Sequence, residues 1–310
     1  MADGYDALSA NESAERWSVF EGFHPLLNYL YFAYVVIVTV FFLHPVLLAI
    51  SFASASAWSV RLGGAKALRF GLIFVLPLML VATALNPVFN HEGVTILGYL
   101  MDNPITLESI LYGVCAALMI GGVILWFRCY TSVMSSDKFI YLFGRVAPAA
   151  SLIISMTLRF IPRYVEQAGR IASARRGLGF DVSSGGFAQR VKNGGEVLSI
   201  MITWALENAV DTADSMRSRG YGLPGRTAYS IYRFDARDGA LLLVLCALTT
   251  IVCVSIFSGT VNMGFFPLFS MNATSAPALV AYVCHAVVCL SPFALDVGED
   301  FVWRSLQSRI

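Results

Sequence analysis

The chain has 310 residues, of which 57% are hydrophobic and only 13% are charged, and its formal net charge is +1. Soluble domains usually carry about 25% charged residues, so this composition excludes an ordinary soluble enzyme or binding module. The mean hydropathy of +0.69 instead indicates a protein that lies largely in a membrane.

Apolar runs long enough to span a bilayer recur along the chain. A spanning helix needs roughly 18 or more mostly apolar residues. Six windows approach or exceed this length: 26–43, 44–60, 70–89, 107–127, 240–257 and 276–295. None of them alternates as a strand does, and backbone in lipid must satisfy its hydrogen bonds internally, so all six are predicted to be helices.

The distribution of lysine and arginine predicts which side of the membrane each loop occupies. The loops 86–106 and 258–275 contain no Lys or Arg. Basic residues flank the other ends of the windows: Arg61, Lys66, Arg69, Arg128, Lys138, Arg304 and Arg309. Because basic loops stay in the cytoplasm, we expect both termini inside and a tight outer turn at His44-Pro45.

Residues 138–161 do not fit this alternation. The segment is mostly apolar, but it is too short for two full crossings at about 1.5 Å per residue. Gly144 and Pro148 offer a place where it could break into a re-entrant or interfacial pair of helices. The sequence leaves its geometry open.

A long basic segment follows between residues 159 and 238. It holds twelve basic and eight acidic residues, a net charge of +4. A connection of this length is uncommon without structure of its own. Pro162 suits the first turn of a helix, and the pair Glu166 and Arg170 is spaced for an i,i+4 interaction. Gly177 and Gly179 are expected to end this helix.

A second amphipathic helix is predicted from about Gln189 to Ser218. Its apolar positions recur at spacings of three and four, as on one face of a helix. This stripe consists of Leu198, Met201, Ile202, Ala205, Ala209, Ala213 and Met216. Gly220, Gly222 and Pro224 are expected to end the helix.

The two helices finish with similar signals, in which an arginine precedes a glycine. The first ends in Ala174-Arg175-Arg176-Gly177 and the second in Arg217-Ser218-Arg219-Gly220. An arginine at a helix C-terminus can simply complement the negative end of the helix dipole. Its planar fork can also bind carboxylates or carbonyls of a partner, and lipid head groups are a competing target. The acids interspersed on both helices favour a protein groove.

Several kinds of chemistry have no support in this sequence. There is no Gly-Lys dipeptide, and therefore no phosphate-binding loop of the P-loop type. The four histidines are scattered without zinc-site spacing, so no metal or other cofactor is expected. Asp, Glu, Lys and Arg are missing from the middle of the six windows, although an ion-coupled carrier normally needs charged residues there. An intramembrane enzyme and a stand-alone secondary transporter are therefore the weaker alternatives.

Several stretches resemble the transmembrane T component of energy-coupling-factor transporters, which are bacterial micronutrient importers of the ABC type. The resemblance is carried by residues 24–32, 86–95, 103–108, 136–144, 155–163, 203–208 and 214–226. The last two of these form the strongest match, which ends in Asp-Ser-Met-Arg-Ser-Arg-Gly-Tyr-Gly-Leu-Pro-Gly-Arg. Beyond residue 240, hydropathy alone supports the assignment.

The resemblance implies a site and partners. The family ends its coupling helices with Ala-Arg-Gly triplets, which Ser218-Arg219-Gly220 matches with serine for alanine. The first triplet is ambiguous, because either Arg175 or Arg176, with Gly177, fits it; Arg176 is slightly favoured. The implied partners are two cytoplasmic ABC-type ATPase subunits that bind these helix ends and a membrane S component that binds the substrate. No nucleic-acid partner is expected.

The predicted fold is an all-α membrane protein with about six transmembrane helices, a re-entrant or interfacial segment and long amphipathic cytoplasmic helices. We expect three regions: an N-terminal membrane region (1–160), a cytoplasmic helical region (161–238) and a C-terminal membrane region with a short tail (239–310). The expected location is the bacterial cell membrane, and the expected role is transport of a vitamin or a metal with the energy supplied by other subunits.

Overall fold

The structure is a computed structural model that describes residues 18–100, 103–144, 147–181, 185–221, 232–261, 263–266, 269–271 and 275–307. It divides into two compact units. The bundle unit comprises residues 1–136 and 232–310, and the helix-pair unit comprises residues 137–231. Each unit is described by itself.

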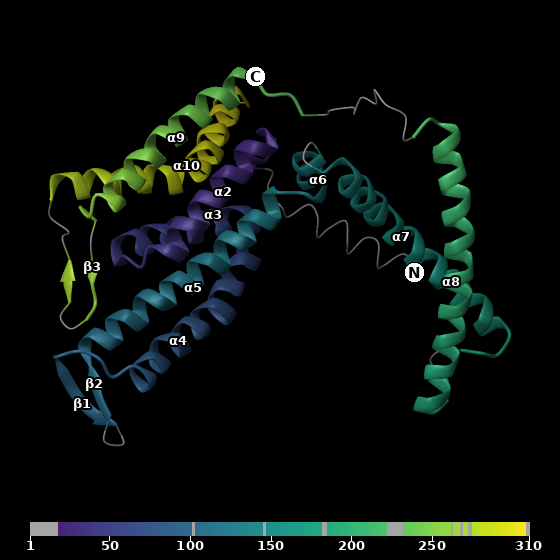
Figure 1. Ribbon diagram of the computed structural model, residues 1–310, viewed down its shortest axis with the longest axis horizontal. Coiled ribbons are helices and arrows are strands. Elements are labelled where there is room, and N and C mark those ends of the chain that lie inside the picture. Colours follow the sequence, from purple (N-terminus) through teal and green to yellow (C-terminus); the bar gives the residue numbers. More distant parts are fainter. Residues whose placement is uncertain are drawn as a thin grey trace. The chain divides into compact units, whose positions relative to one another are not determined.

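The bundle unit consists of apolar helices joined at one end by short hairpins (Figure 1). Its helical elements are η1 (Val19–Gly22), α2 (Pro25–Phe41), α3 (Pro45–Phe70), the π-helical turn η2 (Gly71–Val75), α4 (Leu76–Phe89), α5 (Leu107–Val133), α9 (Ala236–Phe257) and α10 (Ala276–Gln307). Its strands are β1 (Ile96–Leu100), β2 (Asn103–Thr106), β3 (Met263–Gly264) and β4 (Ser270–Met271). The two antiparallel pairs β1–β2 and β3–β4 were not expected from the sequence.

Helix starts in this unit follow from local chemistry. Pro25 and Pro45 occupy the first helical positions of α2 and α3, where a missing N–H costs nothing. The Thr106 side chain caps α5 by accepting a hydrogen bond from the Ser109 amide. Asp235 opens α9 with a capping box.

The chain reverses direction at Gly64, within what the sequence suggested was a loop. Gly64 has φ 54° and ψ −139°, a conformation open mainly to glycine, inside an otherwise continuous run of helical residues. Both flanking helices pack closely against α5 at Gly121. A Cβ atom added to this glycine would lie 2.6 Å from Met79 Sδ of α4 and 3.1 Å from Phe52 Cε2 of α3. The second and third predicted windows are thus a helical hairpin.

Contacts along α5 give the directions of its neighbours. Trp126 donates a hydrogen bond to Ser51 Oγ (2.9 Å), and Cys129 Sγ lies 3.9 Å from the Ala55 carbonyl, so α3 runs parallel to α5. Contacts between α4 and α5 run in the opposite sense. Gly121 of α5 lies beside Met79 of α4, whereas Gly113, earlier in α5, lies beside Thr83, later in α4. Therefore α4 runs antiparallel to both α3 and α5.

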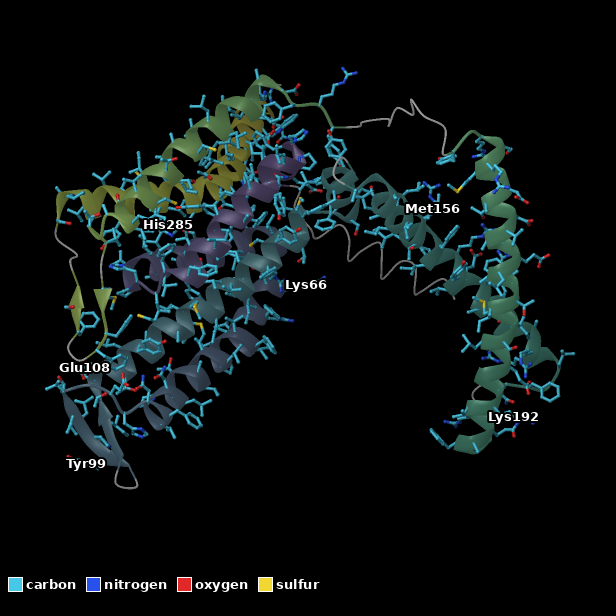
Figure 2. All side chains as sticks on the ribbon, viewed as in Figure 1. Lys66, Tyr99, Glu108, Met156, Lys192 and His285 are labelled. Atoms are coloured by element: carbon cyan, nitrogen blue, oxygen red, sulfur yellow. The ribbon has the colours of Figure 1, made fainter. Side chains whose placement is uncertain are left out.

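The bundle has two distinct ends. At the hairpin end, His44 Nε2 lies 3.2 Å from the Tyr282 hydroxyl, and the Tyr112 ring lies 5.1 Å from the Phe265 ring. Figure 2 shows Tyr99 on the β1–β2 hairpin and Lys66, near the α3–α4 reversal, at the opposite end. We call that opposite end the Asp296 end, after the buried residue described below.

Aromatic side chains fill the core of the bundle. Phe32 and Trp58 stack at 5.7 Å between centroids, and Trp126 meets the edge of Tyr31 at 6.0 Å. Trp58, Trp126 and Phe20 are fully buried. Burial of large aromatics contributes strongly to packing, so this cluster joins η1, α2, α3 and α5 into one core.

Four described helical runs are long and apolar enough to cross a membrane: Pro45–Phe89, Leu107–Val133, Ala236–Phe257 and Ala276–Gln307. The first contains the hairpin at Gly64 and hence two of the predicted windows. The shorter apolar helix Pro25–Phe41 spans about 26 Å, close to the thickness of the hydrocarbon core. The six predicted windows therefore correspond to observed helices.

The helix-pair unit contains α6 (Ser136–Gly144), α7 (Pro148–Gly177) and α8 (Phe187–Ser218). The sequence left the geometry of residues 138–161 open; in the structure α6 ends at Gly144 and α7 begins at Pro148. The predicted helix start at Pro162 is wrong, because Pro162 lies inside α7. An exposed proline in mid-helix is tolerated when solvent can serve the carbonyl that it leaves without a donor.

Candidate functional site

The end of α7 forms a Schellman motif. The Gly179 amide donates to the Arg176 carbonyl (3.0 Å), and the Phe180 amide donates to the Arg175 carbonyl (3.0 Å). Gly179 has φ 85°, the left-handed conformation that this motif requires. Gly177 is the last residue of the helix, two positions before that turn.

The end of α8 repeats the same motif. The Gly220 amide donates to the Arg217 carbonyl (3.0 Å), the Tyr221 amide donates to the Met216 carbonyl (3.1 Å), and Gly220 has φ 77°. Ser218 is the last helical residue, and its hydroxyl donates to the Ser215 carbonyl (2.8 Å). The stop predicted at Gly220 is confirmed, whereas Gly222 and Pro224 lie outside the described residues.

The two Schellman motifs have the same hydrogen bonds. An alignment by these hydrogen bonds differs by two residues from an alignment by the Arg-Gly sequence pattern. By their hydrogen bonds, Arg176 occupies the position of Arg217, and Arg219 occupies the position of Leu178. Arg176-Gly177 and Arg219-Gly220 are thus similar in sequence only. The two arginines occupy different positions in the final turns of their helices.

Arg175 and Arg176 have different surroundings. The Arg175 side chain is only 14% exposed and forms an ion pair with Glu196 of α8. The Arg176 side chain is 68% exposed, with Nε 3.4 Å from an Asp181 carboxylate oxygen. Arg219 is exposed as well. Arg176 and Arg219 are therefore the two triplet arginines that present their side chains to solvent.

Helices α7 and α8 pack antiparallel. The Tyr164 ring meets the Trp204 ring edge-on at 5.5 Å, and Arg163 donates to Asn208 Oδ1 (3.1 Å). Further along α7, Arg175 pairs with Glu196, which lies earlier in α8. The predicted i,i+4 pair between Glu166 and Arg170 is present on the exposed side of α7.

This packing divides the predicted apolar stripe of α8. Met201, Ala205 and Met216 are partly buried, whereas Leu198, Ile202, Ala209 and Ala213 are exposed. Leu206 and Val210, which the sequence analysis did not include, are 64% and 62% exposed beside them. We call these exposed residues (Leu198, Ile202, Leu206, Ala209, Val210 and Ala213) the outward face of α8. It is an apolar surface without a covering element in the described part of the helix-pair unit.

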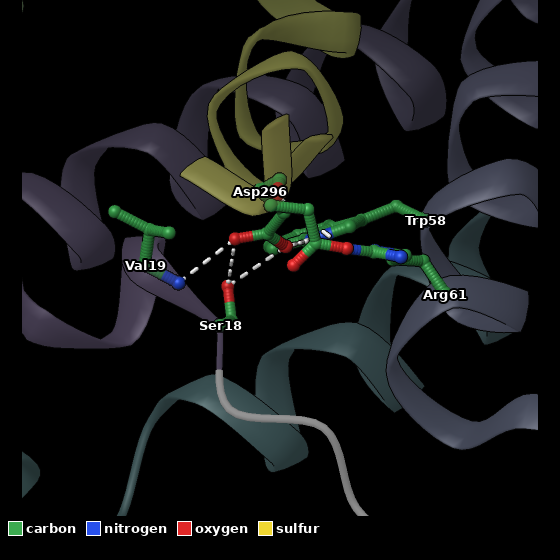
Figure 3. Close-up of polar contacts among 6 residues, drawn as sticks. Ser18, Val19, Trp58, Arg61 and Asp296 are labelled. Atoms are coloured by element: carbon green, nitrogen blue, oxygen red, sulfur yellow. Dashed lines mark hydrogen bonds and ion pairs between the residues drawn. The ribbon is translucent and has the colours of Figure 1, made fainter. Parts of the chain in front are cut away.

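The bundle unit holds a polar site that the sequence did not reveal. Asp296 of α10 is only 4% exposed and accepts hydrogen bonds from the Ser18 hydroxyl (2.8 Å), the Val19 amide (2.8 Å) and Trp58 Nε1 (2.9 Å) (Figure 3). Arg61 forms an ion pair with Asp300 one turn further along α10. The carboxylate thereby ties the start of the described chain to α3 and α10.

A second buried carboxylate acts in the same way at the Asp296 end. Asp238 of α9 accepts hydrogen bonds from the His24 amide (3.1 Å) and the Asp235 amide (3.0 Å). It therefore fixes the start of α2 against the start of α9. Both carboxylates lie at the ends of apolar windows, where a charge count along the sequence assigns them to loops.

Nothing in the described residues resembles a metal centre, since no group of three or more His, Cys, Asp or Glu side chains is placed to hold an ion. His285 lies in the bundle interior with Nδ1 3.1 Å from the Tyr34 hydroxyl, and Cys289 is its only other titratable hydrogen-bonding neighbour among the described residues. His285 of α10 thus forms a polar contact with Tyr34 of α2 that joins the two helices.

The architecture defines a multi-pass helical membrane protein with a separate pair of amphipathic helices. The profile of the CbiQ family, described as cobalt transport protein, matches residues 21–229, about two thirds of the chain. The chain belongs to the CbiQ family. The matched region contains α7, α8 and both Schellman motifs.

Named relatives are energy-coupling factor transporter transmembrane proteins, EcfT. The Staphylococcus aureus protein is 27% identical over 247 residues, which cover 74% of this chain and 90% of that protein. The Lactobacillus helveticus protein is 36% identical over 89 residues, or 28% of this chain and 32% of the relative. The Exiguobacterium sibiricum protein is 34% identical over 99 residues, or 32% and 38%. The last two alignments span about a third of each relative.

Proposed function

We propose that the chain is the transmembrane coupling subunit of an ABC-type energy-coupling-factor importer. In this role it transmits motion from two cytoplasmic ATPase subunits to a membrane S component that binds a vitamin or a metal. One observation carries the proposal: the family match includes both long amphipathic helices and the exposed arginine at the end of each.

The geometry of the helix pair supports binding to two separate ATPase subunits. Glu196 marks the place where the end of α7 meets α8, and Arg219 ends α8. At 1.5 Å per residue these points are about 35 Å apart, more than the width of a helix-binding groove. The guanidinium groups of Arg176 and Arg219 are planar forks suited to a carboxylate or carbonyl in a protein groove. We include the neighbouring residues Gly177, Ser218 and Gly220 in the two proposed binding sites.

The outward face of α8 supports a second contact. A contiguous apolar surface on a helix that also carries Glu207, Asp211 and Asp214 favours a protein or membrane partner over water. We assign this face to the S component or to the membrane-embedded part of the complex. The predicted stripe residues Met201, Ala205 and Met216 are partly buried and do not belong to this face.

The orientation follows from charge. Arg61, Lys66 and Arg69 lie near the α3–α4 reversal at the Asp296 end, whereas the sequence of both hairpin segments lacks Lys and Arg. The positive-inside tendency puts the Asp296 end, and with it both chain termini, in the cytoplasm of a bacterial cell. Along the chain, the helix-pair unit begins at residue 137, shortly after α5 ends at Val133.

A stand-alone secondary transporter, the main alternative, is not supported by relatives named as transporter transmembrane components. The chain also lacks a phosphate-binding Gly-Lys loop, so ATP hydrolysis is assigned to the partners.

The test is co-purification. The tagged chain, extracted from its native membrane in mild detergent, should retain two P-loop ATPase subunits and one small membrane protein at fixed stoichiometry. The same chain purified alone should bind no ATP. Uptake of an ion-coupled substrate by the isolated chain in liposomes would contradict the proposal.

A further inference from the structure

Two contacts hold the Arg175 side chain inside the helix pair. Its guanidinium pairs with Glu196 of α8 and lies over the Phe180 ring, with the Cζ atom 5.5 Å from the centroid. Its Nε is buried and has no hydrogen-bond partner in the part of the chain that the structure describes. Such a side chain cannot turn outward without breaking the ion pair and the ring contact together.

The backbone of the same residue ends α7. The Arg175 carbonyl accepts hydrogen bonds from the amides of Leu178 and Phe180, so the residue fixes the turn that follows. In a Schellman motif an apolar contact usually joins the side chains at the positions that Arg175 and Phe180 occupy here. Here the guanidinium over Phe180 replaces that contact, whereas Met216 and Tyr221 occupy the same positions at the end of α8.

The turn after α7 is attached to α8 independently of Arg175. Asn193 is 2% exposed, and its side-chain amide donates to the Asp181 carbonyl (2.8 Å). Gln189 in turn donates to Asn193 Oδ1 (3.1 Å). At the other end of the pair, Tyr164 and Trp204 pack edge to face. The two helices are thus joined at both ends of their contact, and Arg175 supplies the charged link.

We propose that Arg175 is a positioning residue that makes α7 and α8 move as one body and keeps Arg176 directed outward for its partner. This inference rests on the proposed function, because it assumes that force enters at the helix ends. An ATPase that pulls on Arg176 would move α8 through the link between Arg175 and Glu196. Without the link, the Asn193 hydrogen bond and the contact between Tyr164 and Trp204 would still transmit part of that motion, so α8 would follow the end of α7 less completely.

The test compares three variants in the assembled transporter. Arg175→Ala should keep ATPase capture within about twofold of wild type, because Arg176 and Arg219 remain. Transport per ATP hydrolysed should fall by roughly fivefold or more. The exchanged pair Arg175→Glu with Glu196→Arg should recover part of that ratio, which a purely structural loss would not. Arg170→Ala, another arginine of α7, whose ion pair with Glu166 is exposed, is the matched control.

Loss of ATPase capture by Arg175→Ala to the extent seen for Arg176→Ala would overturn the inference, since Arg175 would then be a docking residue. An unchanged transport ratio would overturn it as well. A second measurement does not depend on the ATPases. Spin labels at the exposed positions Ser173 and Ser215 should give a broader distance distribution in Arg175→Ala, and an unchanged distribution would exclude the link. If wild type captures no ATPase, the proposed function alone fails.

Discussion

Trp58 donates its indole N–H to Asp296 across 238 positions of sequence, at a distance of 2.9 Å. The acceptor is a buried carboxylate that also serves the Ser18 hydroxyl and the Val19 amide. A buried charge is stable only when it is well hydrogen-bonded, and here three donors from two distant segments satisfy it. These hydrogen bonds join η1, α3 and α10 at the Asp296 end of the bundle.

Asp296→Ala should therefore destabilise the bundle strongly. The substitution leaves three donors without their acceptor, and each buried unsatisfied donor costs about 1–3 kcal/mol. Thermal unfolding in detergent should show a clear fall in melting temperature, with a smaller fall for Ser18→Ala, which removes one of the three donors. Asp300→Asn is the control, because its ion pair with Arg61 is 46% exposed on the Asp300 side and should contribute little. Equal melting temperatures for Asp296→Ala and Asp300→Asn would contradict this account.

Arg176→Ala and Arg219→Ala should leave membrane insertion intact and weaken binding of the ATPases. Removing one partner of a buried charge pair costs on the order of 2–5 kcal/mol, enough for more than a tenfold loss of affinity. Pull-down titrations of the solubilised chain measure this loss, and the double variant should be weaker than either single one. Undiminished uptake by the double variant would show that these arginines do not dock a partner.

Ala209→Asp should block assembly although both arginines remain. Ala209 lies on the outward face of α8, and an unpaired charge buried there by a partner is costly. Ser215→Asp, exposed on the opposite side of the same helix, should assemble normally. Size-exclusion chromatography of the complexes distinguishes the two. Normal assembly of Ala209→Asp would mean that the outward face stays in water.

Single-cysteine labelling should confirm the orientation. In a background without the native cysteines, probes at Asn90 and Met271, both at the hairpin end, should react with an impermeant reagent from outside. Probes at Ser183 and Ser308, which lie outside the described residues, should not. Outside labelling of Ser183 would reverse the assigned topology and remove the basis for ATPase docking.

His44 should make the stability of the bundle depend on pH. Burial lowers the pKa of His44 below its ordinary value, and its Nδ1 has no hydrogen-bond partner among the described residues. A lowered pKa means that the folded state holds fewer protons than the unfolded state, so stability is lost as pH falls below about 6.5. Melting temperatures at pH 8 and pH 5 should differ less in His44→Gln than in wild type. The same difference in both proteins would place the pH dependence elsewhere.

Helix positions and their local ends were predictable because they depend on neighbours a few residues apart. The stop at Gly220 and the pair of Glu166 with Arg170 are of this kind. The start of α7 was misplaced at Pro162, because a proline signals a first turn only when nothing earlier continues the helix. That condition depends on packing and solvent, which a local pattern does not contain.

The helical class, the apolar windows and the arginine at each amphipathic helix end follow from local sequence patterns alone. Which arginine is covered depends on packing: Arg175 faces Glu196 while Arg176 faces solvent, because adjacent residues on a helix point about 100° apart and the neighbouring helix covers only one of them. Packing also puts Asp296 in the core. Its donors Ser18 and Trp58 lie hundreds of residues away, and only the folded chain brings them together.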